Sequence, residues 1–125
     1  MGLAPYGEDR FGRQMDELLH LHEDGSYQLD MSYFAHHYST ETIYNRRFVE
    51  LFGRPARSAD EPLEDFHRDL ACSAQARLEE ALVTMARTLH REHPSENLVV
   101  AGGLGLNSST NYRLLQDTPF QHLFI

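Results

Sequence analysis

The feature that most constrains the fold is a long run of apolar residues at helical spacing in the middle of the chain. Asp60, Glu61 and Pro62 suit a first helical turn, whereas the dipeptide His93-Pro94 ends a helix. We therefore expect one helix from about Pro62 to Glu92, roughly 45 Å long, that serves as a core element. The stripe comprises Leu63, Phe66, Leu70, Ala74, Leu78, Leu82, Met85 and Leu89, widened by Ala71, Ala81 and Ala86.

The composition is that of one globular domain. The chain has 125 residues, of which 41% are hydrophobic and 24% are charged. Its net charge is −8 and it contains no lysine, which argues against a nucleic-acid-binding surface. Cys72 is the only cysteine, so we expect a buried thiol and no disulfide within the chain. No apolar run is long enough for a membrane span, no signal peptide is visible, and we expect a cytoplasmic location.

The remaining segments predict short elements around the long helix. Residues 1–7 contain Gly and Pro and indicate a loop, and Gly25 and Gly53 follow helical patterns that they should end. The expected fold class is mainly α with a few short strands, an α/β arrangement. We expect helices at 8–22, 39–52 and 108–116, strands at 26–31, 98–101 and 120–125, and a polar connector at 56–61.

The stretch 97–107 reads as a buried strand, a glycine turn and the start of a helix. Residues 98–101 are apolar without alternation, which is typical of a strand covered on both faces. Gly102 and Gly103 would let an anion or sugar approach the main chain, and Asn107 is a good N-cap. Such a turn can hold a phosphate or a nucleotide. The pattern is neither G-x-G-x-x-G nor a P-loop, so a tight turn without a ligand is the open alternative.

Two other groups of residues have a functional and a plain interpretation. His36 and His37 could ligate a metal, but adjacent side chains point apart, so packing or a polar surface is favoured. Four arginines close in sequence could bind a phosphate or carboxylate, but a salt-bridged surface is favoured. These are Arg46, Arg47, Arg54 and Arg57.

Four stretches, in order along the chain, resemble the O-carbamoyltransferases of the nodulation and antibiotic-tailoring type. Met-Gly-Leu-Ala-Pro-Tyr-Gly at 1–7 resembles that family's loop, and Leu-Phe-Gly-Arg-Pro at 51–55 fits its L-F-G-x-P segment. His-Arg-Asp-Leu-Ala-Cys-Ser-Ala-Gln at 67–75 resembles its H-x-D-[IL]-A-x-S-x-Q helix. Residues 101–107, followed by Asn111, resemble A-G-G-V-A-L-N-x-x-x-N, with Leu104 and Gly105 in place of Val and Ala.

The resemblance implies a ribonuclease-H-like domain related to actin, the sugar kinases and the tRNA threonylcarbamoyl transferases. It implies transfer of a carbamoyl group from carbamoyl phosphate, through an ATP-dependent carbamoyl-adenylate, to a hydroxyl of a sugar or natural product. Carried over by residue, it assigns adenylate contacts to Gly102, Gly103 and Asn107. It also implies a divalent metal ion, whose ligands and whose catalytic residues we expect outside residues 1–125.

By the same resemblance, residues 1–125 are a single partial domain from the middle of the catalytic domain. We therefore expect no transferase activity from this chain alone. The alternative is a non-catalytic remnant that acts as a small interaction or nucleotide-binding module. In that case the long stripe would be only half covered, leaving an apolar patch, and the chain could form a homo-oligomer.

Overall fold

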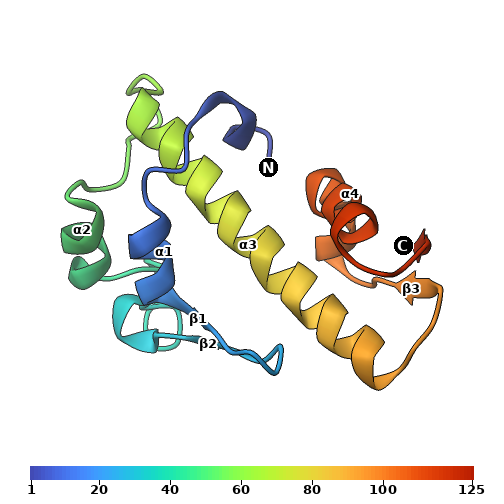
Figure 1. The fold of residues 1–125 in the computed structure, drawn as a ribbon. Coiled ribbons are helices and arrows are strands. Elements are labelled where there is room, and N and C mark those ends of the chain that lie inside the picture. The colour runs from blue at the N-terminus through green and yellow to red at the C-terminus, as the bar shows by residue number, and fades with distance from the viewer.

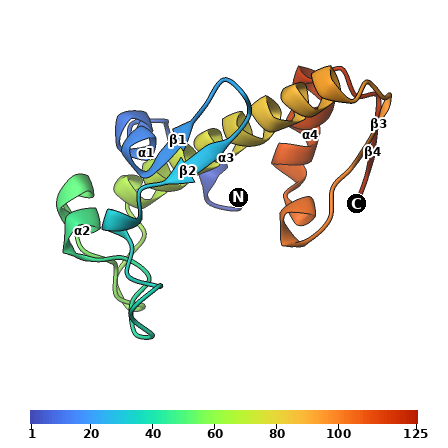
Figure 2. The ribbon, with the colours of Figure 1, turned by 90° about the horizontal axis from the view of Figure 1, so that it is seen from below.

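A computed structural model describes all 125 residues, which are arranged along one long helix, α3 (Figure 1). This helix runs from Asp65 to Glu92 and has 28 residues, about 42 Å at the usual rise. The other elements form two groups, one beside each half of α3 (Figure 2). In chain order they are 3₁₀ helix Ala4–Tyr6, α1 Gly12–Leu18, β1 Leu19–Leu21, β2 Tyr27–Leu29, 3₁₀ helix Met31–Tyr33, α2 Arg46–Phe52, β3 Asn97–Val99, 3₁₀ helix Gly103–Leu106, α4 Ser108–Asp117 and β4 His122–Phe124.

The long helix begins three residues later than the sequence predicts. Glu64 is its N-cap and accepts the His67 main-chain N–H, while His67 Nδ1 accepts the Glu64 main-chain N–H at 3.0 Å. This reciprocal pair satisfies two donors at the helix start, so helix geometry begins at Asp65 and not at Pro62. The predicted end at Glu92 is confirmed.

In the group beside the first half of α3, both helices are shorter than expected. The predicted helix 8–22 is α1 alone, because residues 19–21 pair antiparallel with β2, with Leu19 opposite Leu29. The predicted helix 39–52 starts only at Arg46, where Asn45 caps α2. Gly53 ends α2 with φ 71°, as predicted. A core of Met15, Leu18, Tyr33 and Phe52 joins these elements.

The group beside the second half of α3 is a strand–helix–strand unit. Strands β3 and β4 are parallel, with Leu98 opposite Leu123, and α4 connects them. Its core is Val83, Ala86, Leu98, Leu114 and Phe120. The prediction that residues 98–101 are covered on both faces is wrong, because the two-stranded sheet packs on one face only and leaves Val99 72% exposed.

The burial of α3 also differs from the expected pattern. None of the eight residues of the predicted stripe is fully buried, and Met85 and Leu89 are 38% and 44% exposed. Polar residues of α3 are buried in their place, because the N-terminal segment and α4 pack on adjacent faces of the helix. None of the helices is both long enough and apolar enough to span a lipid bilayer. The fold is thus a mixed α/β arrangement of four α-helices and two small sheets.

Candidate functional site

The glycine turn after β3 is open to solvent. Gly102 has φ 88°, a conformation that favours glycine, and both Gly102 and Gly103 are exposed. A Cβ built on either residue would meet no atom within 4 Å. The main-chain N–H groups of Gly102 and Leu104 donate no hydrogen bond within the protein. The turn therefore offers free donors to a ligand that approaches the main chain.

The two asparagines beside the turn hold it in shape. Asn107 caps α4, as predicted, since its Oδ1 accepts the Thr110 main-chain N–H at 3.2 Å. Asn111 Nδ2 donates to the Gly105 carbonyl oxygen at 2.7 Å. Gly105 itself is buried, and a Cβ there would lie 2.7 Å from a methyl group of Ile125. Gly105 thus packs closely against Ile125, whereas the first two glycines face open space.

A groove of about 620 Å³ lies at the start of α4, the helix that follows this turn. Three stretches that are far apart in sequence line it: the N-terminal loop, the middle of α3 and the start of α4. Its volume falls in the range of small-molecule sites. The lining residues are Met1, Gly2, Ala4, Pro5, Cys72, Gln75, Ala76, Glu79, Ser108, Ser109 and Tyr112.

Buried polar side chains connect the groove to the turn. Glu79 Oε1 accepts from Gln75 Nε2 at 2.7 Å and from the Ser109 hydroxyl at 2.5 Å. Arg113 lies 3.6 Å from Glu79 Oε2, so the buried carboxylate has a cationic neighbour. Asn107 Nδ2 donates to Gln75 Oε1 at 3.0 Å. The sequence analysis did not predict a role for Glu79 or Gln75. The available signal was two polar residues four positions apart on an otherwise amphipathic helix.

The α3 motif at 67–75 also holds the N-terminal segment. Asp69 Oδ1 accepts the main-chain N–H of Glu8 at 2.8 Å, and Ser73 Oγ accepts that of Phe11 at 2.9 Å. Gly7 lies so close to α3 that a Cβ there would be 2.1 Å from the Arg68 carbonyl oxygen. These contacts place the loop at 1–7 against the helix and so form one wall of the groove.

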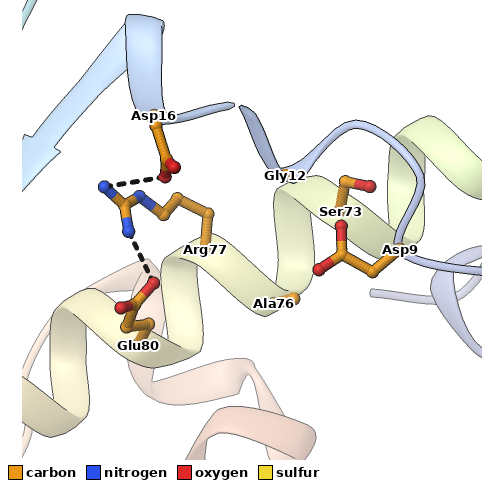
Figure 3. A pocket seen from close by; sticks show the side chains of 7 residues that line it. All are labelled: Asp9, Gly12, Asp16, Ser73, Ala76, Arg77 and Glu80. Carbon is orange, nitrogen blue, oxygen red and sulfur yellow. Dashed lines mark hydrogen bonds and ion pairs between the residues drawn. The ribbon is translucent and has the colours of Figure 1, made fainter. Parts of the chain in front are cut away.

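A second cavity, of about 260 Å³, lies between α1 and α3 (Figure 3). Arg77 stands between two carboxylates in it, 3.0 Å from Asp16 and 2.5 Å from Glu80. The same guanidinium donates to the Leu19 carbonyl oxygen at 2.9 Å. These partners make Arg77 a link between α1, β1 and α3, and its charge offsets only part of the acidic lining, which includes Asp9.

The histidines and arginines named above lie away from the turn and the groove. The rings of His36 and His37 are 5.8 Å apart, and His37 packs edge-on against Tyr38 at 4.7 Å. The arginines have partners of their own, which favours the surface interpretation. Arg46 pairs with Glu50, Arg54 with Glu64, Arg57 binds the carbonyl oxygens of Ser58, Ala59 and Glu61, and Arg47 lies 4.6 Å from the Tyr33 ring centroid.

Cys72 lines the groove as a half-buried thiol rather than the fully buried one expected. Burial raises the pKa of this thiol, and the carboxylates of Asp9 and Asp69 raise it further. A thiol with a raised pKa is a poor nucleophile at neutral pH. Cys72 therefore contributes surface to the groove rather than reactivity.

Comparison with known proteins connects this arrangement to one family of enzymes. The family described as "Carbamoyltransferase N-terminus" matches residues 1–125. The chain is 41% identical to the uncharacterized protein sll1178 of Synechocystis, over all of this chain and 20% of that protein. It is 28% identical to the nodulation protein NolNO of Sinorhizobium fredii and 25% identical to NolO of Bradyrhizobium diazoefficiens, over all of this chain and 17% and 21% of those proteins.

The match covers the full chain, and with it the turn, the groove and the α3 motif. The chain belongs to the carbamoyltransferase family and corresponds to that family's N-terminal domain description. It spans about a fifth of the length of the curated relatives that it matches.

Proposed function

We propose that this chain forms part of an enzyme that transfers a carbamoyl group to a hydroxyl of a sugar or natural product. The donor in this proposal is carbamoyl phosphate, activated as a carbamoyl-adenylate at the expense of ATP. The observation that carries the proposal is the exposed glycine turn, whose free N–H groups lie beside the capped start of α4. Family membership supports the reaction class.

The turn fits an adenylate by its chemistry. A phosphate or ribose could approach Gly102 and Gly103 closely, because no side chain stands in the way. The side-chain amide of Asn107 is already bonded to Gln75 and to the Thr110 main-chain N–H. We therefore propose that Asn107 contributes to ligand binding by capping the start of α4, where the ligand would lie. Main-chain donors held in place before the ligand arrives cost little reorganisation when negative charge develops nearby.

The proposal extends to the fold. The parallel pair β3–β4, connected through α4, is a strand–helix–strand unit of the kind from which larger α/β sheets are built. This unit supports the view that the chain is part of a ribonuclease-H-like domain of the actin and sugar-kinase type. In that domain the glycine turn would face the nucleotide.

The divalent metal ion implied by the resemblance does not fit this chain. No group of three His, Cys, Asp or Glu side chains among the 125 residues could hold a metal ion. We therefore assign no step of the reaction to a metal held by residues 1–125. The contribution of this chain is to bind and orient the adenylate and to place the groove beside it.

Titration with ATP tests the proposed site. Gly103→Val adds a side chain in open space without a positive φ, so the variant should keep the melting temperature of the parent chain. We expect it to weaken ATP binding at least tenfold, because the side chain would block approach to the turn. Ala59→Val is the control, since Ala59 is an exposed residue without a positive φ, in the connector between α2 and α3 and away from the turn. Equal ATP affinity in the parent chain and Gly103→Val would refute the proposed site.

One observation favours a second candidate, an interaction module. Two apolar cavities of about 290 and 380 Å³ follow the exposed stripe of α3, and Leu82 and Met85 line both. Surfaces of this kind often bind another protein. Size-exclusion chromatography tests this candidate: self-association that Met85→Glu abolishes, and that Ile43→Glu at a remote exposed site leaves intact, would support it. A monomer that binds ATP would favour the enzyme.

A further inference from the structure

We infer that Gln75 is a positioning residue that sets the glycine turn in place, acting through the side-chain amide of Asn107. The two amides exchange hydrogen bonds: Gln75 Nε2 donates to Asn107 Oδ1 at 3.2 Å, and Asn107 Nδ2 donates to Gln75 Oε1 at 3.0 Å. The pair joins the middle of α3 to the residue that ends the turn and caps α4. Its consequence for ligand binding rests on the proposed function.

The orientation of both amides follows from one buried carboxylate. Glu79 can only accept hydrogen bonds when ionised, so the NH₂ group of Gln75 must face it, at 2.7 Å. The carbonyl oxygen of Gln75 is then directed to the NH₂ group of Asn107. This leaves the carbonyl oxygen of Asn107 for the Thr110 main-chain N–H that it caps. A donor–acceptor sequence therefore runs from Glu79 to the start of α4.

This series of hydrogen bonds is buried, and an unpaired polar group is costly away from solvent. Glu79 is 7% exposed, Gln75 is 9% exposed and Thr110 is 1% exposed. The Thr110 hydroxyl oxygen also lies 3.2 Å from Gln75 Nε2, so three acceptors surround an NH₂ group that has two hydrogens to donate. Burial makes the polarity of Gln75, and not only its size, matter to the turn.

The turn depends on Asn107 through the main chain. The Asn107 N–H donates to the Leu104 carbonyl oxygen at 3.0 Å, and the Gly105 N–H donates to that of Gly102 at 3.1 Å. If Asn107 moves away from Gln75, the first of these bonds loses its fixed donor. The N–H groups of Gly102 and Leu104, which donate no hydrogen bond within the protein, would then no longer be held in one arrangement. Gln75 also lines the groove, so it connects the groove to the turn.

Replacing Gln75 with glutamate or leucine separates polarity from size. In Gln75→Glu a second carboxylate lies within hydrogen-bonding distance of Glu79, so the pair holds a shared proton more tightly than an isolated carboxyl group. The charged group beside the pair is Arg113 on α4, 3.6 Å from Glu79 Oε2, and the titratable side chains of Cys72 and Tyr112 lie on the same groove. The shared proton restores a donor at acidic pH and leaves as the pH rises.

The experiment is amide hydrogen exchange at pH 5 and pH 8, corrected for intrinsic exchange and compared with amides of residues 83–90 in α3. We expect the Gly105 and Asn107 amides to exchange about tenfold faster in Gln75→Leu at both pH values. In Gln75→Glu the same loss should occur at pH 8 and largely disappear at pH 5. The exchange of Gly105 and Asn107 is compared with that of residues 83–90 in the same sample, and the two pH values are compared within one variant. A general loss of stability in Gln75→Leu therefore does not obscure the result.

Unchanged exchange at Gly105 and Asn107 in both variants would overturn the inference. A Gln75→Glu chain that is equally loosened at both pH values would overturn it as well, because size rather than polarity would then hold the turn. ATP titration of the parent chain is a separate measurement. Absence of ATP binding together with the expected exchange pattern would refute the proposed function and leave the positioning role of Gln75 in place.

Discussion

The buried carboxylate of Asp69 accepts the main-chain N–H of Glu8 at 2.8 Å, across 61 positions of sequence. One turn further along α3, the Ser73 hydroxyl oxygen accepts the main-chain N–H of Phe11 at 2.9 Å. Two main-chain donors of the N-terminal segment are thus satisfied by helix side chains rather than by a neighbouring strand. This attachment defines the wall of the groove that residues 1–5 provide.

Removal of the Asp69 carboxylate should destabilise the chain. Asp69→Ala leaves the Glu8 N–H without its acceptor and removes the partner that lies 3.4 Å from Arg10, and we expect a loss of about 1–3 kcal/mol. Asp65→Ala is the matched control, because Asp65 is an exposed acidic residue in the first turn of the same helix. Urea denaturation should show a loss below about 1 kcal/mol for the control. Similar losses in the two variants would contradict the role of Asp69.

Gly7→Ala should displace the N-terminal segment from α3. An added Cβ would lie 2.1 Å from the Arg68 carbonyl oxygen, and main-chain atoms of a helix cannot yield cheaply. Overpacking of this kind costs about 1–3 kcal/mol. Gly2→Ala meets nothing within 4 Å and should leave the unfolding free energy unchanged. Thermal denaturation of the two variants distinguishes them, and an unaltered Gly7→Ala would show that the segment is not closely packed.

Adjacent leucines in α4 should respond very differently to truncation. Leu114 is 3% exposed in the core shared with α3, whereas Leu115 is 38% exposed. Leu114→Ala should cost about 2–5 kcal/mol, because it leaves a cavity in that core. Leu115→Ala removes the same atoms from a largely solvated site and should cost less than about 1 kcal/mol. Chemical denaturation measures both, and a reversed order would disprove the assigned face of α4.

The start of α3 should contribute an acid-sensitive part of the stability. The hydrogen bond from Arg54 to Glu64, followed by the charge of Arg54, lowers the pKa of the Glu64 carboxyl group from its ordinary 4.5. A carboxyl group with a lowered folded-state pKa stabilises the fold above its unfolded pKa and loses that contribution as pH falls. We expect the unfolding free energy to fall more steeply below about pH 4.5 in the parent chain than in Glu64→Gln.

The control for the acid-dependence is Asp60→Asn, which removes a nearby carboxylate that makes no ion pair. Its unfolding free energy should follow the parent chain down to pH 3. Urea denaturation at several pH values measures the slopes. If Glu64→Gln has the same acid slope as the parent chain, the Arg54–Glu64 pair does not contribute to the stability of the helix start.

Local signals predicted the parts of this fold that local interactions control. The periodicity of 63–89 predicted α3, Gly53 was correctly placed at the end of α2, and Asn107 at the start of α4. The expected helix at 8–22 was wrong where residues 19–21 pair with a strand that follows eight residues later. Pairing energy overrode helix propensity there, which a single stretch of sequence does not reveal.

In the candidate site, too, the sequence predicted local features and not the contacts between distant segments. The assignment of adenylate contacts to Gly102, Gly103 and Asn107 stays a prediction, and the resemblance that suggested it came from short motifs. Those motifs did not predict that residues 1–5, 72–79 and 108–112 line one groove. They also did not predict that Gln75 and Glu79 would be buried, since polar side chains on a helix are usually solvated.

By itself, the sequence of this chain determined the long helix, the glycine turn with its asparagine cap, and membership of the carbamoyltransferase family. These depend on residue spacing and on side chains that interact with their own neighbours in the chain. Only the tertiary structure decided which face of α3 is buried, how the N-terminal segment attaches to Asp69 and Ser73, and how Gln75 meets Asn107. Those features depend on contacts between residues that are tens of positions apart, whose free energy no local pattern records.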